Sequence, residues 1–337
     1  MNTLSELRQD IVSGDWVVIA TGRARRPHEF LRQKRSPFRQ PKRTCPFERV
    51  IAGTRSLYYP EDSTARKKEW IVQVIPNKYP VFEAKGGVCP EFHASDPYQW
   101  TEGVGFHEVV ITRFHERSLA RMSDEEVLLV VKAYQERYLA LQKEACVEYV
   151  SIFHNHGRLS GATITHPHSQ IIAIPVIPPD VVRSLQGSAL YFHKYERECI
   201  HCLVITHERK ADERVVYEND RFIALAPYAS KVSFEIRIFP KVHSAWFEAM
   251  DEVTRAAFAN ALRVALAKLF KGLQNPDYNF FLHTAPARNP ERFSHYHWHL
   301  EILPKTAMWA GFEIGTGIEI SAIAPEAAAA FLKKMKV

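Results

Sequence analysis

Apolar and polar positions along the first half of the chain predict a strand, a long helix and a second strand, in that order. Residues 107–112 and 149–153 are rich in Val, Ile, Tyr and Phe, and between them the apolar residues of 127–141 recur at helical spacing. Ser123, with Glu126 three residues later, forms a capping box that predicts where the helix begins. Such an amphipathic helix needs a sheet face on which to bury its apolar side.

The second half of the chain repeats this order. Residues 234–239 alternate apolar and charged positions, which indicates a strand with one buried face. A helix is expected to begin near Asp251 and to carry apolar residues through 253–269, and a strand pattern follows at 278–282. The repetition predicts an α+β fold of tandem repeats, with an antiparallel sheet and packed helices in each half.

The repetition also suggests how the chain is divided. We expect one repeat in residues 1–185 and the other in residues 186–337, with 178–197 as the connector. The tail from Gly311 is expected to form Gly-rich turns, and Pro325 to open a closing helix.

Each half contains a pair of histidines separated by one residue. His166–Gln170 reads His-Pro-His-Ser-Gln, and His297–Glu301 reads His-Trp-His-Leu-Glu. Side chains two apart on a strand point to the same face. If the first histidine of a pair binds a metal, the second can present a free imidazole nitrogen to a substrate.

Cysteine, histidine and glutamate residues accompany both pairs at equivalent places. Two ligands from a tight turn and two from separate strands suit tetrahedral zinc, although the first half offers a carboxylate in place of one thiolate. Four protein ligands fill a tetrahedron, so both sites are interpreted as structural; the alternative is that these are ordinary core and surface residues. The two sets are Cys45, Glu48, His115 and His166 in the first half, and Cys199, Cys202, His243 and His297 in the second.

If His166 is a ligand, His168 remains for chemistry. Asn155, Gly157 and Gly161 precede it, and glycines let backbone amides approach a phosphate closely. An imidazole beside such a cradle can attack phosphorus and hold the transferred group as a phosphoramidate. The alternative is a hydrogen-bonded core histidine. The second copy lacks the glycine-rich segment before the histidine pair, so His299 is expected to be structural or to line the substrate site.

Composition limits the class of protein. The chain has 337 residues, 46% of them hydrophobic, and a net charge of +6. We expect a globular protein without a membrane span or a secretory segment, located in the cytoplasm. The five cysteines suit metal or free thiols in a reducing compartment, with Cys89 and Cys146 incidental. The basic stretch 23–43 is either a solvated loop or a positively charged surface that binds a phosphorylated ligand. It lacks the interleaved aromatic residues that are typical of nucleic-acid binding.

These motifs together resemble the galactose-1-phosphate uridylyltransferase branch of the histidine triad superfamily, over nearly the whole chain. The segments that carry the resemblance are Arg23–Pro27, Cys45–Glu48, Asn77, His115, Asn155 with Gly157, Gly161–Thr163, His166–Gln170 and Gly311–Gly317.

The resemblance implies a histidine-triad-like two-repeat fold, a homodimer and ping-pong transfer of a nucleoside monophosphate. By matching positions, His168 would be the nucleophile, and Gln170 would steady the nucleotidylated intermediate. Phe312 and Glu313 would belong to the region that selects the hexose. The residues expected to meet the nucleotide are Arg23, Arg26, Asn77, Asn155, Gly157, Gly161 and Thr163.

Some positions depart from the uridylyltransferase pattern. Ser184 stands near the place of a glutamate that, with three late histidines, holds a second metal in familiar members. The pair Cys199 and Cys202 instead looks like relatives with a second zinc there, including plant ADP-glucose phosphorylases. Ala307 and Glu319 stand where a lysine and a glutamine of the hexose region are expected.

Three functions follow from these observations. The leading one transfers UMP from UDP-glucose to galactose 1-phosphate, with two zinc ions per chain. The second keeps the same histidine but moves AMP from ADP-glucose to phosphate. The third is a zinc-stabilised nucleotide-binding protein without turnover. In the first two the partners are a nucleotide sugar and a sugar phosphate or phosphate, without nucleic acid or membrane.

Overall fold

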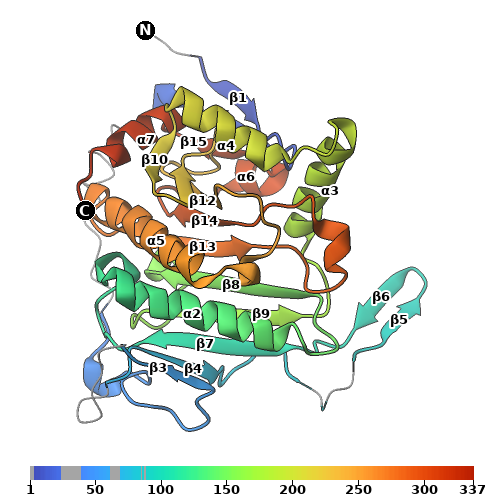
Figure 1. Ribbon diagram of the computed structural model, residues 1–337, viewed down its shortest axis with the longest axis vertical. Coiled ribbons are helices and arrows are strands. Elements are labelled where there is room, and N and C mark those ends of the chain that lie inside the picture. Colours follow the sequence, from blue (N-terminus) through green and yellow to red (C-terminus); the bar gives the residue numbers. More distant parts are fainter. Residues whose placement is uncertain (1–3, 24–38, 61–68, 85, 87–88) are drawn as a thin grey trace.

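The structure is a computed structural model, and it describes residues 4–23, 39–60, 69–84, 86 and 89–337. Its centre is a ten-stranded antiparallel sheet with the order β10-β11-β12-β14-β13-β8-β9-β7-β4-β3 (Figure 1). The strands are β3 (Ser56–Tyr58), β4 (Val72–Pro76), β7 (Phe106–Thr112), β8 (Tyr149–His156), β9 (His168–Ile174), β10 (Val215–Glu218), β11 (Phe222–Leu225), β12 (Ile236–Pro240), β13 (Tyr278–His283) and β14 (His299–Pro304).

Two of these strands, β8 and β13, join the halves of the chain. They pair antiparallel, with Asn155 opposite Asn279 and Phe153 opposite Phe281. The expected α+β fold with antiparallel strands and packed helices is therefore confirmed, and the sheets of the two halves are continuous.

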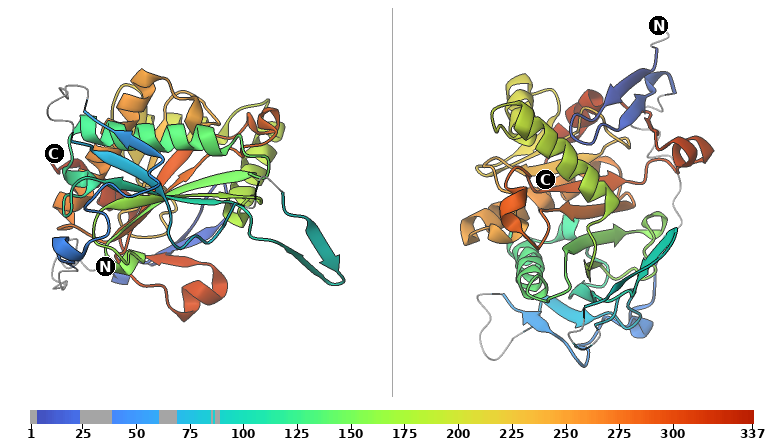
Figure 2. Two further views of the ribbon diagram at one scale, coloured as in Figure 1. Left: turned by 90° about the horizontal axis from the view of Figure 1, so that it is seen from below. Right: turned by 90° about the vertical axis from the view of Figure 1, so that its right-hand side faces the viewer.

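Helices cover one face of the sheet (Figures 1 and 2). The long helices are α2 (Asp124–Leu141) and α5 (Glu252–Gly272), and the expected caps are present, because Ser123 and Asp251 accept backbone N–H bonds from their first turns. Tyr134 of α2 and Ile171 of β9 belong to one apolar cluster that also runs under α5. Alternation along β9 then leaves the side chains on either side of Ile171 on the opposite face.

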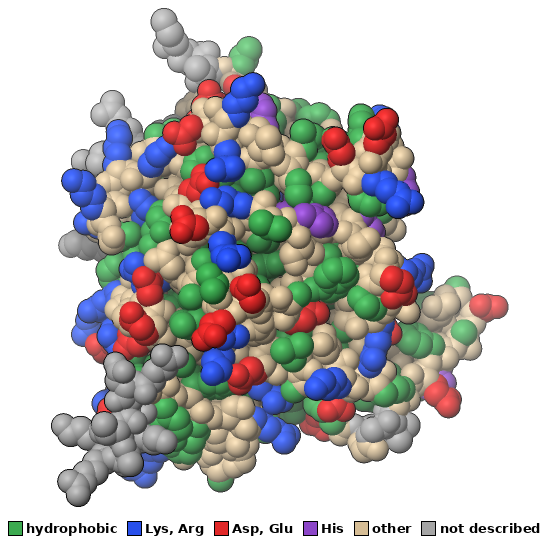
Figure 3. Space-filling model, in the orientation of Figure 1, with side chains coloured by type: hydrophobic (Ala, Val, Ile, Leu, Met, Phe, Trp, Pro, Cys, Tyr) green, Lys and Arg blue, Asp and Glu red, His purple; other side chains and the backbone are tan. Residues whose placement is uncertain are grey.

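Other helices and strands flank this layer. The described residues also form β1 (Glu6–Gln9), β2 (Trp16–Ile19), β5 (Phe92–Ser95), β6 (Tyr98–Thr101), α3 (Pro179–Lys194), α4 (Ile200–Ala211), α6 (Gly311–Thr316), β15 (Glu319–Ser321) and α7 (Pro325–Lys333). β1, β2 and β15 make a small sheet, and the β5–β6 hairpin projects from the body (Figure 1). Basic and acidic side chains are interspersed on the helical face (Figure 3). Among the described residues, no helix combines the length and apolarity needed to cross a bilayer.

One local prediction needs correction. The Gly-rich segment from Gly311 forms the short helix α6 and not a series of turns, because the apolar and acidic residues between its glycines permit a helical turn. The segment 178–197 contains the helix α3. Pro325 does open the closing helix.

Cys89 and Cys146 are not incidental, because a disulfide joins them. Cys89 precedes the β5–β6 hairpin and Cys146 follows α2, and their separation of 57 positions gives no local signal of the pairing. The fold, and not the sequence spacing, brings them together.

The buried His154 of β8 makes stability depend on pH. It stacks on Phe280, and its Nδ1 lies 2.9 Å from Ser169 Oγ. Burial lowers its pKa well below the ordinary value. His154 therefore binds a proton in the unfolded chain at a pH at which it stays neutral in the folded chain. As a result, the free energy of unfolding falls as the pH drops below about 6.5.

The variant His154→Phe keeps the ring stacking and removes this titration. We expect its free energy of unfolding to depend less on pH, by up to about 1.4 kcal/mol per pH unit below pH 6. Urea unfolding at pH 7.5 and 5.5 measures the difference. An equal pH dependence in the variant and the unmodified protein would contradict the prediction.

Candidate functional site

The face of the sheet that α2 and α5 leave uncovered carries the residues singled out for chemistry. Strand β9 begins at His168, and its partly exposed positions include His168 and Gln170, whereas Ser169 between them is buried. His166 lies in a bend just before the strand, so only the second histidine of the pair belongs to it. In the second half, His299 likewise begins β14.

The local backbone sets the protonation pattern of His168. Its Nδ1 lies 2.9 Å from the carbonyl oxygen of His166, so Nδ1 carries the proton and donates it. Nε2 then keeps its lone pair. The ring of Phe47 packs edge-on at 5.2 Å. Burial lowers the pKa of His168, which keeps the imidazole neutral and nucleophilic near neutral pH.

Gln170 is oriented by a residue that the sequence analysis did not single out. Nδ1 of His107 accepts the backbone N–H of Val81 at 3.3 Å, so Nε2 carries the proton and donates to Gln170 Oε1 at 2.8 Å. Burial lowers the pKa of His107 and favours this neutral form. The amide NH₂ of Gln170 is therefore left as a donor. Asn77 lies beside the same ring, with Nδ2 3.0 Å from Nε2 of His107.

The loop between β8 and β9 provides the expected turn. Asn155 accepts a hydrogen bond from Asn279 Nδ2 at 2.7 Å, and this amide also donates to the carbonyl of Ser160. Gly157 has φ 83°, and a Cβ there would lie 2.2 Å from the carboxylate of Asp277, so only glycine fits. Gly161 (φ 88°) ends the 3₁₀ turn Arg158–Ser160, and Thr163 follows it on the surface.

Other predicted substrate residues lie elsewhere or are not described. Arg23 ends a 3₁₀ turn after β2, and Arg26 lies outside the described residues. Phe312 and Glu313 belong to α6, which follows β14, and β13 and β8 separate β14 from β9 (Figure 1). Within one chain, the structure therefore does not bring these two residues to His168.

The first predicted metal group is assembled. The candidate ligand atoms of Cys45, Glu48, His115 and His166 lie within 4.8 Å of one another. Nε2 of His166 donates to the Thr112 carbonyl at 2.6 Å, and Nε2 of His115 donates to the Gln40 carbonyl at 2.8 Å. Both Nδ1 atoms are thus lone-pair donors.

The same group carries an unbalanced contact that a cation would satisfy. His115 Nδ1 lies 2.6 Å from Glu48 Oε1. Both atoms are buried, and neither has a hydrogen-bond partner. The hydrogen bond to a backbone carbonyl is also the usual outer contact of a metal-binding histidine. The residues therefore fit a bound cation.

The second predicted group is built in the same way. Cys199, Cys202, His243 and His297 also offer ligand atoms within 4.8 Å. Nε2 of His297 donates to the Pro240 carbonyl at 2.9 Å, and Nε2 of His243 to the Ser294 carbonyl at 2.8 Å. Nδ1 of His297 lies 3.5 Å from Cys202 Sγ, and a hydrogen bond with Cys202 lowers the pKa of the Cys199 thiol. Thiolate and imidazole at these places fit a tetrahedral soft cation.

Comparison with known proteins settles the family. Residues 1–178 match the family described as galactose-1-phosphate uridyl transferase, N-terminal domain. The chain belongs to this family. ADP-glucose phosphorylase from Arabidopsis thaliana is 32% identical over 345 residues, covering 100% of this chain and 94% of the relative. Galactose-1-phosphate uridylyltransferase from Thermotoga maritima is 29% identical over 344 residues, covering 99% of each chain.

Solved structures of the galactose-1-phosphate uridyl transferase type share the fold. A crystal structure of ADP-glucose phosphorylase from Arabidopsis thaliana with bound ADP-glucose has a TM-score of 0.79 at 29% identity, covering 99% of this chain and 100% of that one. A uridylyltransferase structure has a TM-score of 0.73 at 29% identity, covering 98% and 97%. The likeness extends over both halves of the chain.

The protonation of His168 can be measured directly. We expect ¹⁵N NMR of the His168 imidazole at pH 6.5 to show a neutral ring with its proton on Nδ1. Burial lowers the pKa of His168, and the carbonyl oxygen of His166 accepts a hydrogen bond from Nδ1. An Nε2–H tautomer, or a ring already half protonated at pH 6.5, would contradict the geometry described above.

Proposed function

We propose that this protein transfers a nucleoside monophosphate from a nucleotide sugar through a covalent adduct on His168, and that the leading reaction moves UMP from UDP-glucose to galactose 1-phosphate. The observation that carries the proposal is the hydrogen bond from His168 Nδ1 to the His166 carbonyl, which leaves Nε2 unprotonated on the open face. A binding protein has no need of a nucleophile held in this form.

The reaction balances in two displacement steps. Nε2 of His168 attacks the α-phosphorus of UDP-glucose, a P–N bond forms, and the P–O bond to glucose 1-phosphate breaks. A phosphate oxygen of galactose 1-phosphate then attacks the same phosphorus, which forms UDP-galactose and returns the free imidazole. Throughout, the Nδ1 proton stays hydrogen-bonded to the carbonyl of His166, which stabilises the positive charge that develops on the ring.

The surrounding residues receive roles in this proposal. The NH₂ group of Gln170, fixed by His107, donates to a phosphoryl oxygen without adding charge. The turn at Gly157 and Gly161 lets the backbone approach the phosphates. The residues that would meet the nucleotide around them are Arg23, Arg26, Asn77, Asn155 and Thr163.

A homodimer would complete the acceptor site. Helix α6 and the segment before it expose Met308, Trp309, Phe312 and Ile314, at 81%, 51%, 48% and 75% of their surfaces. An exposed apolar segment of this kind is typical of an interface. In this proposal, residues 1–185 carry the nucleophile, and residues 186–337 present Phe312 and Glu313 to the site of a second copy.

A second reaction uses the same histidine, namely adenylyl transfer from ADP-glucose to phosphate. The identity of 32% over the whole chain with a plant ADP-glucose phosphorylase favours it. Ala307 and Glu319 also depart from the hexose-region residues that the uridylyltransferase pattern leads us to expect.

We assign zinc to both metal groups, two ions per chain, and the cytoplasm as the compartment. Zinc accepts the mixture of thiolate, imidazole and carboxylate that the groups offer. Cys45, Cys199 and Cys202 lie outside the Cys89–Cys146 disulfide, so their thiolates are available as ligands. When bound, the ions would hold the loops before β9 and β14 in place.

Intact-protein mass spectrometry after mixing with UDP-glucose or ADP-glucose, without acceptor, tests the function. We expect a uridylyl adduct that disappears on adding galactose 1-phosphate, and no adduct in His168→Ala, which should still bind the nucleotide sugar. An adenylyl adduct discharged by phosphate would establish the second reaction instead. No adduct with either donor, or exchange that survives in His168→Ala, would contradict nucleotidyl transfer through this residue.

Elemental analysis after dialysis tests the metal assignment. We expect about two zinc ions per chain, and about one in Cys202→Ser, because the loss of one thiolate from a Cys₂His₂ set weakens the site strongly. Cys146→Ser is the control, since Cys146 lies in the disulfide and outside both groups. Metal-free protein, or an equal metal content in Cys202→Ser, would overturn the assignment.

A further inference from the structure

The second half of the chain carries a site equivalent to that of His168, with altered neighbours. His299 begins β14 as His168 begins β9, and its Nδ1 lies 3.1 Å from the carbonyl of His297. The altered neighbours follow from register. Gln170 lies opposite Val109, whereas Glu301, the counterpart of Gln170, lies opposite Arg237.

Carboxylates outnumber cations in the cavity around His299, which is lined by Asp10, Asp15, Asp180, Glu301 and Glu319 and by Arg183, Lys231 and Arg237. Arg237 Nε lies 3.0 Å from Glu301 Oε1 and 3.1 Å from Glu235 Oε1, and its Nη1 lies 2.8 Å from Asp10 Oδ2. One guanidinium is thus shared among three buried carboxylates. Nε2 of His299 faces Glu301 Oε1 at 3.5 Å, so a phosphoryl group on this imidazole would meet a carboxylate. A phosphate placed here would therefore face more carboxylates than cations.

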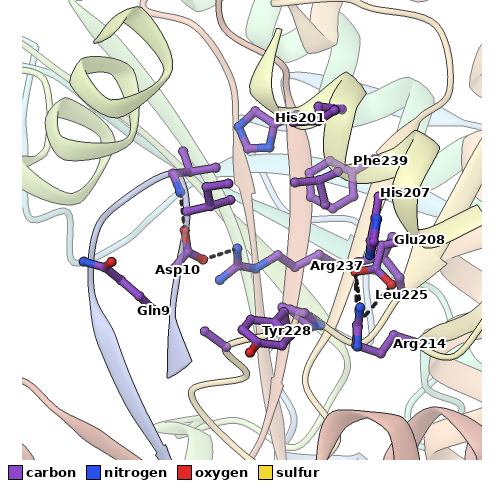
Figure 4. Close-up of a pocket in the computed structure, with 16 residues that line it drawn as sticks. Gln9, Asp10, His201, His207, Glu208, Arg214, Leu225, Tyr228, Arg237 and Phe239 are labelled. Carbon is purple, nitrogen blue, oxygen red and sulfur yellow. Dashed lines mark hydrogen bonds and ion pairs between the residues drawn. The ribbon is translucent and has the colours of Figure 1, made fainter. Parts of the chain in front are cut away.

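The space for the rest of a nucleotide is nevertheless present. A cavity of about 520 Å³ lies between α4, the β1–β2 segment and the strands β11 and β12 (Figure 4). Leu225, Phe239 and Val204 contribute apolar walls. A second cavity of about 630 Å³ surrounds His299 and Glu301. Asp10, Val12, His201 and Arg237 line both, so the two cavities adjoin. Each volume lies within the range of about 300–1,000 Å³ that is usual for small-molecule sites.

Polar atoms without a partner line this space. Among the described residues, His201 Nε2 and His283 Nδ1 are buried and have no hydrogen-bond partner. His201 lies in the wall of both cavities and His283 in that of the second. Buried polar atoms are nearly always paired, so the unpaired Nε2 of His201 indicates a ligand that pairs with it. His283, with His299 and Glu301, also forms a group that could hold a cation.

The apolar compartment suits an aromatic ring. Phe239 and His201 lie 5.5 Å apart in its wall, and the exposed side chains of Leu203 and Tyr228 surround its mouth. In Figure 4, Arg237 extends between this compartment and Asp10. A planar heterocycle would pack on the rings, with its carbonyl or ring nitrogens within reach of the guanidinium and the imidazoles.

From these observations we infer that the second repeat binds an uncharged nucleoside, with the base in the apolar compartment and the ribose hydroxyls toward His299 and Glu301. The inference rests on the proposed function in one respect, since the first repeat is taken to hold a nucleotide in the equivalent place. The cavities are large enough for the base and the ribose, and the carboxylate of Glu301 stands where the first repeat has Gln170. It is a binding site and not a second catalytic centre.

Equilibrium dialysis with radiolabelled adenosine and uridine tests the inference on the full chain. Saturating UMP and AMP are included to occupy the first site. We expect about one equivalent of one of the two nucleosides to remain bound per chain under these conditions. The corresponding 5′-monophosphate should bind this second site at least tenfold more weakly.

Val204→Trp is the informative variant, because Val204 lines the apolar compartment and does not line the cavity around Glu301. It should weaken the nucleotide-resistant binding at least tenfold. Leu190→Trp is the matched control: Leu190 is 72% exposed on α3 and lines neither cavity, so binding should be unchanged. Circular dichroism confirms that both variants fold.

Three results would overturn the inference: neither nucleoside remains bound, binding persists in Val204→Trp, or the monophosphates displace the nucleoside with equal affinity. Adduct formation on His168 is measured on the same samples. A missing adduct with retained nucleoside binding would reject the proposed reaction and support the second site. An intact adduct without nucleoside binding would support the proposed reaction and reject the second site.

Discussion

The main-chain pairing of β8 with β13 is the contact on which the rest of the structure depends. It turns two short sheets into one sheet of ten strands. Each half alone would present an unpaired strand edge. Each long helix would also lack the apolar contacts that the other half provides, whereas together α2 and α5 bury one continuous apolar face. Because side chains alternate along a strand, covering one face leaves every second residue on the other, where His168 and Glu301 lie.

The pattern of residues predicted much of this arrangement. The caps at Ser123 and Asp251 are short-range features, so they can be read from a few neighbouring residues. The metal groups are long-range, but the repetition of His166 and His297 with their partners supplied the information that one copy lacks. Two independent copies of one spacing predict contacts that a single motif cannot.

Other parts of the site depend on contacts that leave no trace in the spacing. His107 acts on Gln170 from a neighbouring strand, and its role follows only from the register of β7 on β9 and the N–H of Val81. Asp10 and Arg237 are joined across 227 positions. The sequence did not show where the exposed helix α6 lies relative to His168, because the segment that follows β14 could pack against either half of the chain.

The central claim is that two copies of one architecture have separated in chemistry, with Nε2 of His168 alone able to carry a nucleotidyl group. The direct measurement is the position of that group after rapid reaction with a labelled nucleotide sugar. Digestion at alkaline pH, which preserves a phosphoramidate bond, and peptide mass spectrometry should place all of the label on the peptide containing His168. Label on the peptide containing His299 would contradict the account, because Glu301 and its neighbours are held to exclude phosphate there.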